Sequence, residues 1–443
     1  MSDSETIFAL SSGSLPSGIA VIRLSGPAAR TTLESMTGVL PPARQARLSA
    51  IRDRSGQLLD RGLCLFFPGS ASFTGEDCAE LHLHGGRAVV ASVLSALSLL
   101  PGLRAAEAGE FTKRAFLNGK IDLTGAEALS DLISAETEAQ QRFALSNSSG
   151  RHRKLYQDWR QSLLNARALI EAELDFADES DVPGSVAQKV WQEVQTLRDA
   201  IAAHAAGYRN AEIIRDGMKV VIVGAPNAGK SSLLNALVQR EAAIVTDEPG
   251  TTRDLVEVAL DIGGMKILLT DTAGLRRAEG RVEAIGIERT LERAREADLV
   301  LLLEDVHRPV AAPNIPDVPL LRVGNKADRL GPPVERAVGR SEYDCLISAK
   351  TGAGLDALME SLRQSSQVHA ARAGEILPFR LRHVERLGEA VSALDNALSK
   401  ESDDLELRAE DLRIASHALG QISGDIDVED LLDSIFATFC IGK

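Results

Sequence analysis

The sequence has few cysteines and no long hydrophobic run. Only four of its 443 residues are cysteine, they are widely spaced, and no two form a Cys-x-x-Cys pair. This pattern implies neither a disulfide framework nor a structural zinc site. The polar, acidic amino terminus lacks the features of a signal peptide, and no apolar run approaches the length of a membrane span. We therefore expect a cytoplasmic protein that does not associate with a membrane.

Positive charge is also scarce. Lysine and arginine total 49 against 63 aspartates and glutamates, which gives a net charge of −14. Because phosphate groups are bound mainly by Lys and Arg, this balance argues against a broad nucleic-acid-wrapping surface, but it allows a local basic patch or a basic partner. Internal repeats and low-complexity tracts are absent. With 44% hydrophobic and 25% charged residues, the chain has the composition of a globular protein, and its length suggests two to four domains.

A nine-residue stretch that begins at Gly224 is the most informative segment present. Gly224 and Gly229 bracket four residues ahead of Lys230 and Ser231, which is the phosphate-loop pattern. The stretch follows an apolar, strand-like run and opens a helical one, as this motif requires. In such a loop, backbone N–H groups surround phosphate oxygens, the lysine reaches the terminal phosphates and the hydroxyl binds Mg²⁺. The segment predicts a nucleoside triphosphate site.

Three later motifs complete the site and identify the base, and each follows a predicted strand. Asp271-Thr-Ala-Gly274 suits a carboxylate that supports Mg²⁺ and a backbone N–H near the terminal phosphate. Asn325-Lys-Ala-Asp328 supplies a carboxylate that accepts from two N–H groups of guanine, whereas adenine would leave that charge unpaired. Ser348-Ala349-Lys350 fits a loop that closes over the base. Each motif alone is weak evidence, but the four in this order predict a GTP-binding domain.

Hydrophobic periodicity divides the chain into four consecutive segments. The first, 1–119, is rich in glycine, proline and β-branched residues and indicates an α+β domain. Segments 120–216 and 369–443 have long helical patterns, and 217–368 alternates strands with helices. The simplest architecture is one helical domain interrupted by the GTP-binding domain. Two unrelated helical segments are the alternative.

Individual elements follow from the same patterns. Predicted strands lie at 19–24, 78–84, 218–223, 267–269, 320–323 and 343–347. Predicted helices lie at 87–100, 124–143, 155–176, 186–208, 231–237, 381–399, 407–419 and 428–439. Gly263-Gly264 is a hairpin signal that joins two early strands of the GTP-binding domain.

The chain lacks the glutamine that GTPases of the Ras type place after Asp-x-x-Gly to orient the attacking water. The residue there is Leu275, whose aliphatic side chain cannot hold a water. Asn227 suits a monovalent cation that offsets charge together with carbonyls of segment 246–254, but it equally suits a turn or helix cap. In that segment, Thr252 is placed to complete the Mg²⁺ shell. Glu283 has two interpretations: its carboxylate swings in to orient water, or it is a solvated residue at the start of a helix.

Further stretches carry a resemblance to one family. They are Ser72-Phe-Thr-Gly-Glu-Asp77 leading to His84-Gly-Gly86, the run 109–124, which begins Gly-Glu-Phe-Thr-Lys-Arg, and Phe439-Cys-Ile-Gly-Lys443. With the GTPase motifs, they make almost the whole chain similar to the MnmE (TrmE) family of bacterial tRNA modification GTPases. The resemblance implies an N-terminal α+β folate-binding and dimerisation domain, a discontinuous helical domain and an inserted Ras-like P-loop GTPase domain.

The resemblance also implies an activity. It points to a potassium-stimulated GTP hydrolase that drives carboxymethylaminomethyl or aminomethyl modification at carbon 5 of the tRNA wobble uridine, with 5-formyltetrahydrofolate as one-carbon donor. The implied assembly is a homodimer, within a heterotetramer with the FAD-dependent MnmG protein, which would make much of the tRNA contact. Two alternatives are a ribosome-assembly GTPase of the Era type and a non-catalytic GTP switch. The Era class normally carries a basic RNA-binding module, which this acidic chain lacks.

The resemblance implies a role in the site for each residue at a position that matches the family's motifs. The catalytic candidates are Glu283, Lys230 and Cys440, although Cys440 also suits a small buried position. The implied K⁺ ligands are Asn227, Thr246, the Glu248 carbonyl and Thr251, and the implied Mg²⁺ ligands are Ser231 and Thr252. The implied folate contacts are Arg23, Glu80, Lys120 and Lys443. The implied GTP contacts are Asn227, Ala228, Gly229, Lys230, Ser231, Ser232, Thr246, Asp247, Glu248, Pro249, Gly250, Thr251, Thr252, Asp271, Thr272, Ala273, Gly274, Asn325, Lys326, Asp328, Ser348, Ala349 and Lys350.

Overall fold

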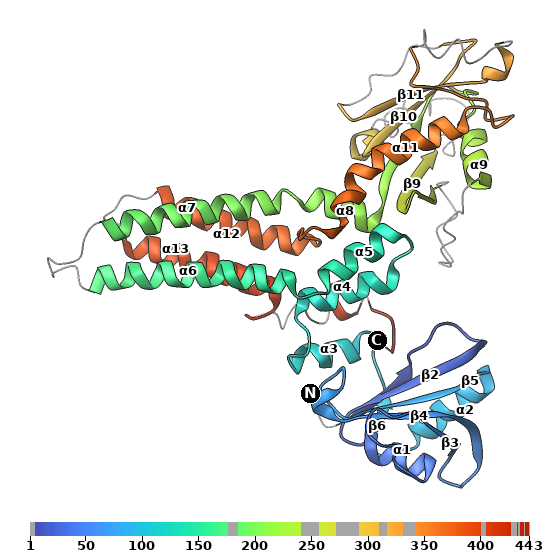
Figure 1. The fold of residues 1–443 in the computed structure, drawn as a ribbon, viewed down its shortest axis with the longest axis vertical. Coiled ribbons are helices and arrows are strands. Elements are labelled where there is room, and N and C mark those ends of the chain that lie inside the picture. Colours follow the sequence, from blue (N-terminus) through green and yellow to red (C-terminus); the bar gives the residue numbers. More distant parts are fainter. Residues whose placement is uncertain are drawn as a thin grey trace, which may run out of the picture. The chain divides into compact units, whose positions relative to one another are not determined.

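The structure is a computed structural model in which the chain forms two compact units. The first unit comprises 1–130, 152–167 and 413–443, and the second comprises 131–151 and 168–412 (Figure 1). The described residues are 5–175, 185–240, 257–271, 292–309, 317–330, 342–399, 405–426, 432, 435–437 and 439–442. None of the helices in these ranges combines the length and the hydropathy that a membrane span requires.

The first unit contains a six-stranded sheet with the order β3-β4-β5-β2-β1-β6. Its strands are β1 (Thr6–Leu10), β2 (Ser17–Ser25), β3 (Arg47–Arg52), β4 (Leu58–Phe67), β5 (Cys78–Gly85) and β6 (Leu103–Ala105). Only the β1–β6 pair is parallel. Alternate side chains of β2, such as Ile22 and Leu24, pack against the helices α1 (Ala29–Thr37) and α2 (Arg87–Ser98). Most of the core of this domain therefore lies on one face of the sheet, while Ile7 and Ala9, which alternate with Phe8 along β1, pack with Phe111 on the other.

The second unit contains another six-stranded sheet, with the order β12-β11-β10-β7-β9-β8. Its strands are β7 (Met218–Val223), β8 (Glu257–Ile262), β9 (Met265–Asp271), β10 (Leu299–Asp305), β11 (Leu320–Asn325) and β12 (Cys345–Leu346). All neighbours are parallel except β8 and β9. The chain passes from β7 to β9 on one side and later to β10 on the other. The carboxyl ends of β7 and β10 thus form the switch point where open α/β sheets bind ligands.

The remaining elements within the described ranges are helical. They are α3 (Glu110–Leu117), α4 (Leu123–Ser134), α5 (Glu138–Asn147), α6 (Arg151–Asp175), α7 (Ser185–Ala205), α8 (Tyr208–Asp216), α9 (Lys230–Arg240), α11 (Leu355–Ala370), α12 (Leu381–Ser399) and α13 (Leu405–Ser423), with short 3-10 turns η1 (Gly69–Ala71), η3 (Ala327–Arg329) and η6 (Ala371–Gly374). Figure 1 shows α7 and α12 side by side, and Arg198 Nε lies 2.7 Å from Asp395 Oδ1 between them. Two helices far apart in sequence are thus paired within the second unit.

The β8–β9 hairpin also contacts a helix in the second unit. Its turn is Gly263–Gly264, as the sequence predicts, and both glycines have positive φ. The backbone N–H of Ala139, in the first turn of α5, donates to the Gly264 carbonyl at 2.9 Å. Lys266 Nζ lies 2.5 Å from Glu136 Oε2. The hairpin that leads into Asp271 is therefore attached to α5 as well as to the sheet.

The structure confirms the predicted strands, although the one at 343–347 is only two residues long. The prediction of a single helix at 124–143 is wrong, because α4 ends at Ser134 and α5 begins at Glu138. The break has a local cause: Thr137 caps α5, and a reciprocal capping box joins it to Gln140. The predicted helix at 186–208 likewise ends at Ala205 before α8 starts. The predicted helix at 428–439 lies mostly outside the described residues.

Candidate nucleotide-binding site

Residues 224–229 join β7 to α9 in a loop that fits closely against two neighbouring strands. A Cβ on Gly224 would lie 2.2 Å from the Leu303 carbonyl oxygen of β10. Gly229 has a φ of +100°, and a Cβ there would lie 2.4 Å from Asn325 Nδ2 at the end of β11. Both positions therefore require glycine, which is the residue that the phosphate-loop motif has there.

Lys230 and Ser231 open α9 at the carboxyl end of the sheet. Lys230 is buried, and its Nζ donates to the carbonyls of Gly224 and Ala225 at 2.8 and 3.1 Å. Ser231 Oγ donates to Asp271 Oδ2 at 2.7 Å. A hydroxyl and a carboxylate held this close are the oxygen donors that Mg²⁺ prefers. The two motifs that supply them are thus brought together as predicted.

Asn325 connects the phosphate loop to the base-recognition segments. Its Nδ2 donates to the Ala228 carbonyl at 2.8 Å. Its Oδ1 accepts from the backbone N–H groups of Lys326 and Ala349, at 2.8 and 3.0 Å. Because the Asn325 side chain is almost fully buried, these bonds are shielded from water. One side chain therefore aligns three of the four predicted motifs.

Asp328 and Ser348 form the opposite side of the site. Ser348 Oγ donates to Asp328 Oδ1 at 2.7 Å. This hydrogen bond holds the pKa of the Asp328 carboxyl below its usual value. Asp328 is exposed and charged at neutral pH, and one of its oxygens is fixed in direction. Such a carboxylate can accept hydrogen bonds from the N–H groups of guanine.

Lys326 makes a link that the sequence did not predict. Its Nζ donates to the Asn227 carbonyl and to Asp305 Oδ2, both at 2.7 Å. Asn227 and Lys326 have φ values of 63° and 65°, in the left-handed region that asparagine tolerates better than most residues. The turn interpretation of Asn227 is thus confirmed, and its cation role stays a prediction. Asp305 was missed, and its only signal was an acidic residue at the end of an apolar strand.

Several predicted positions lie outside the described residues. They are Thr246, Asp247, Glu248, Pro249, Gly250, Thr251, Thr252, Thr272, Ala273, Gly274, Leu275, Glu283 and Lys443. The described part of the site therefore comprises the phosphate loop, Asp271, the Asn-Lys-x-Asp motif and the loop at 348–350.

Two of the expected folate contacts meet in the first unit. Arg23 on β2 lies opposite Glu80 on β5, and Arg23 Nη2 is 3.0 Å from Glu80 Oε1. His82 Nε2 lies 3.1 Å from the other carboxylate oxygen of Glu80. The sheet register thus presents an Arg–Glu–His group on one face. Lys120 is exposed and follows α3, where its backbone N–H donates to the Ala115 carbonyl at 2.8 Å.

The C-terminal segment returns to the first strand. Cys440 is exposed, so the interpretation of it as a small buried residue is wrong. Ile441 forms a β-bridge with Ala108, and the Gly442 carbonyl accepts from Ser11 Oγ at 2.7 Å. Gly442 also lies against Leu10, next to the residue that pairs with Arg23 in the sheet. The C-terminal motif and β1 are therefore neighbours within the first unit.

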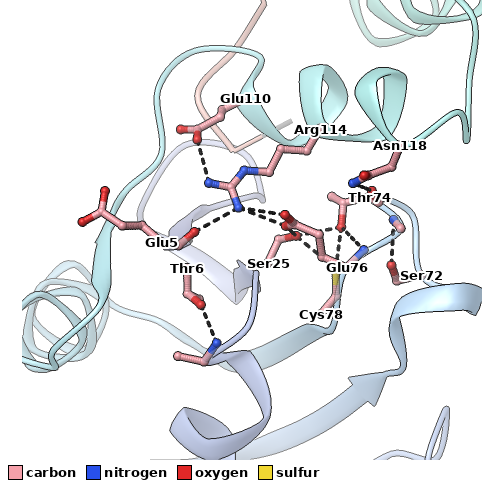
Figure 2. A network of polar contacts seen from close by, with 12 residues as sticks. Glu5, Thr6, Ser25, Ser72, Thr74, Glu76, Cys78, Glu110, Arg114 and Asn118 are labelled. Carbon is pink, nitrogen blue, oxygen red and sulfur yellow. Dashed lines mark hydrogen bonds and ion pairs between the residues drawn. The ribbon is translucent and has the colours of Figure 1, made fainter. Parts of the chain in front are cut away.

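The distinctive stretches 72–77 and 109–124 hold each other through Arg114 (Figure 2). Arg114 Nη1 lies 3.0 Å from Glu76 Oε2, and Nη2 lies 3.0 Å from Glu110 Oε1. Glu76 also accepts from Ser25 Oγ at 2.6 Å, and Asn118 Nδ2 donates to the Thr74 carbonyl at 2.7 Å. Charge-assisted bonds of this kind fix geometry as well as energy. Much of what is distinctive in these stretches therefore serves to attach α3 to the sheet.

Comparisons with known proteins extend over the whole chain. The family model described as "GTP-binding protein TrmE N-terminus" matches residues 6–120, and the one described as "MnmE helical domain" matches 123–440. A relative from Chelativorans sp. (strain BNC1), named tRNA modification GTPase MnmE, is 65% identical over 99% of this chain and 98% of its own length. A relative of the same name from Mesorhizobium japonicum is 56% identical over 100% of both chains. The chain therefore belongs to the MnmE family of tRNA modification GTPases.

Proposed function

We propose that the chain hydrolyses GTP at the loop 224–231 and that this hydrolysis drives modification at carbon 5 of the tRNA wobble uridine. The observation that carries the proposal is the set of bonds made by Asn325, which ties the phosphate loop to both base-recognition segments. A nucleotide whose phosphates occupy the loop would present its base to Asp328. The carboxylate then favours guanine over adenine.

Metal ions complete the proposed chemistry. Mg²⁺ would be held by Ser231 and Thr252 and would neutralise phosphate charge. K⁺ would be held by Asn227, Thr246, the Glu248 carbonyl and Thr251, in place of an arginine finger. Lys230 would contact the terminal phosphates, and Glu283 would orient the attacking water. The left-handed backbone of Asn227 supports this assignment, because it fixes the residue at a defined place in the loop.

The first unit supplies the one-carbon donor in this proposal. Arg23, Glu80, Lys120 and Lys443 would bind 5-formyltetrahydrofolate, with Cys440 near the transferred carbon. The Arg23–Glu80 pair supports this, because a guanidinium suits the carboxylates of a glutamyl tail and a carboxylate suits the amino edge of a pterin. The approach of residues 439–442 to β1 is a second support.

The proposed assembly is a homodimer that joins the FAD-dependent MnmG protein and acts on tRNA. Within each chain we propose four segments: 1–119 for folate binding and dimerisation, 120–216 and 369–443 for one discontinuous helical domain, and 217–368 for the GTPase domain. The pairing of α7 with α12 supports the discontinuous domain, because these helices flank the GTPase segment in sequence.

One experiment tests the proposal as a whole. GTP hydrolysis is measured in K⁺ and in Na⁺, at several protein concentrations, with and without 5-formyltetrahydrofolate. We expect faster turnover in K⁺ and a rise in turnover per protomer with protein concentration. Equal rates in the two salts would contradict the cation role of Asn227.

The residue roles are tested by GTP hydrolysis together with equilibrium binding of nucleotide and of 5-formyltetrahydrofolate. Glu283→Ala should abolish hydrolysis and leave nucleotide binding intact. Removal of Lys443 should weaken folate binding and leave GTP hydrolysis largely unchanged. Asp328→Asn should move base preference from guanine toward xanthine, because an amide donates where the carboxylate accepts. An unchanged base preference would contradict the proposed site.

A further inference from the structure

Asp305 ends β10 at the carboxyl edge of the sheet, between β7 and β11. One carboxylate oxygen, Oδ2, accepts from Lys326 Nζ at 2.7 Å, and the other, Oδ1, accepts from the His307 backbone N–H at 3.0 Å. The Asp305 side chain is 16% exposed and that of Lys326 is 23% exposed. The hydrogen bond from Lys326 holds the pKa of Asp305 below its usual value. The carboxylate is therefore charged, fixed in direction and paired with a partly desolvated ammonium.

The Lys326 ammonium also binds the phosphate loop. Lys326 Nζ donates to the Asn227 carbonyl at 2.7 Å, and Asn325 Nδ2 donates to the next carbonyl, Ala228, at 2.8 Å. Two consecutive peptide groups of the loop are thus held from the end of β11. Asn325 is fixed by its burial. Lys326 ends in an ammonium on a flexible four-carbon chain, so it needs a second partner to stay in one place. Asp305 is that second partner.

We propose that Asp305 is a positioning residue for GTP hydrolysis that acts through Lys326 on the phosphate loop at Asn227. The inference rests on the proposed function of this site. Loss of the carboxylate leaves the ammonium with greater freedom and the Asn227 peptide less firmly oriented. Small displacements of groups that align phosphates reduce the rate of transfer steeply.

The neighbouring residue provides a matched control. Glu304 is also acidic and lies on β10, but its Oε2 accepts from Arg322 Nη2 at 3.0 Å. Successive side chains of a strand point to opposite faces, so Glu304 does not share the position of Asp305 toward the loop. Glu304→Gln makes the same change of charge one residue away.

The test is a double-mutant cycle on kcat/KM for GTP in the full-length protein, with Asp305→Asn, Lys326→Met and both together. We expect Asp305→Asn to lower kcat/KM about tenfold and Lys326→Met to lower it further. Because Asp305 acts through Lys326, the double variant should match Lys326→Met within about twofold. Glu304→Gln should stay within about twofold of the unchanged protein.

Independent, multiplicative effects of the two substitutions would overturn the proposal, as would a change of less than about twofold for Asp305→Asn. Asparagine keeps the shape of the side chain and an acceptor for His307, and thermal unfolding checks that the variant folds. Should the variant unfold, Asp305→Ser, which also removes the charge, takes its place in the same cycle with Lys326→Met, and multiplicative effects again overturn the proposal. The base preference of Asp328→Asn reports separately on the guanine site. Failure of the proposed function is therefore distinguishable from failure of the role given to Asp305.

Discussion

Gly229 combines two restrictions in one residue. Its φ of +100° disfavours any side chain, and its Cα faces Asn325 Nδ2 so closely that a methyl group would displace the amide. Displacement of Asn325 would break its bond to Ala228 and disturb its bond to Ala349. The phosphate and base sides of the site therefore both depend on glycine, which has no side chain, at position 229.

Gly229→Ala should weaken GTP binding by at least about tenfold, because it disrupts the loop and the base segments together. The measurement is the equilibrium dissociation constant of a fluorescent, non-hydrolysable GTP analogue. Gly388→Ala is the matched control, since Gly388 lies in α12 with open space around its Cα. It should leave binding unchanged and stabilise the protein by about 0.5–1 kcal/mol. Normal binding by Gly229→Ala would contradict the geometry of the loop.

Glu110 pairs with Arg114, as Figure 2 shows, and its carboxylate also pairs with Arg104. Burial raises the pKa of Glu110, but hydrogen bonds from Arg104, the Glu107 N–H and Arg114 lower it, and the net result is below its usual 4.5. A lowered pKa means that the folded state favours the charged form. Its contribution to stability should be full above pH 4.5 and should be lost as the pH falls through the lowered value.

Glu110→Gln should therefore reduce the free energy of unfolding by about 2 kcal/mol at neutral pH. The difference from the unchanged protein should shrink in acid, because protonated Glu110 also lacks the charge. Urea unfolding at a series of pH values measures it. Glu34→Gln, at an exposed position on α1, is the control and should change stability by less than about 0.5 kcal/mol. A difference that persists at acid pH would contradict the assignment.

At the scale of elements, local patterns predicted most of the structure. Alternation of apolar residues identified β2 and β5, and the helical spacing of 381–399 matches α12 at both ends. The break between α4 and α5 was missed, because the apolar period continues through it and only the Thr137–Gln140 pair marks it. Partners such as Arg114 with Glu76 were beyond prediction, because their contact depends on how α3 packs against the sheet.

The capping box of α5 makes a prediction at this scale. Thr137→Ala should destabilise the protein by about 1 kcal/mol, because the first turn of the helix loses an acceptor for the Gln140 N–H. Thr196→Ala is the control. Thr196 is exposed on α7 and donates to the Gln192 carbonyl one turn earlier, so its loss should cost less than about 0.5 kcal/mol. Thermal unfolding compares the two, and equal losses would argue against the cap.

At the scale of the molecule, the second unit contains a sheet together with helices that precede and follow its strands in the sequence. The site was largely predictable because each of its motifs follows a parallel strand, and parallel strands place their carboxyl ends at one edge. The Asp305–Lys326 link was not, because neither residue type nor spacing shows that β10 and β11 are neighbours. The attachment of the β8–β9 hairpin to α5 was also hidden, since its ion pair joins residues 130 positions apart.

This attachment predicts a difference between the full chain and the excised segment 217–368. Lys266→Ala removes the ion pair with Glu136, whose side chains are 16% and 27% exposed, and should cost about 1 kcal/mol in the full chain. That corresponds to about 2–4 °C in unfolding temperature. The excised segment lacks Glu136, so the same substitution should leave its unfolding temperature unchanged. Equal shifts in the two proteins would contradict the contact with α5.

The return of residues 439–442 to β1 has a consequence for how the chain is made. Ser11 and Gly442, which share a hydrogen bond, are separated by 431 positions. A ribosome releases β1 early and residues 439–442 much later, and domains generally fold as they emerge. The sheet of the first unit can form during synthesis, but the end of β1 must wait for its partner until all the residues between Ser11 and Gly442 have been translated. The sheet of the first unit thus starts to form long before its bond to Gly442 can be made.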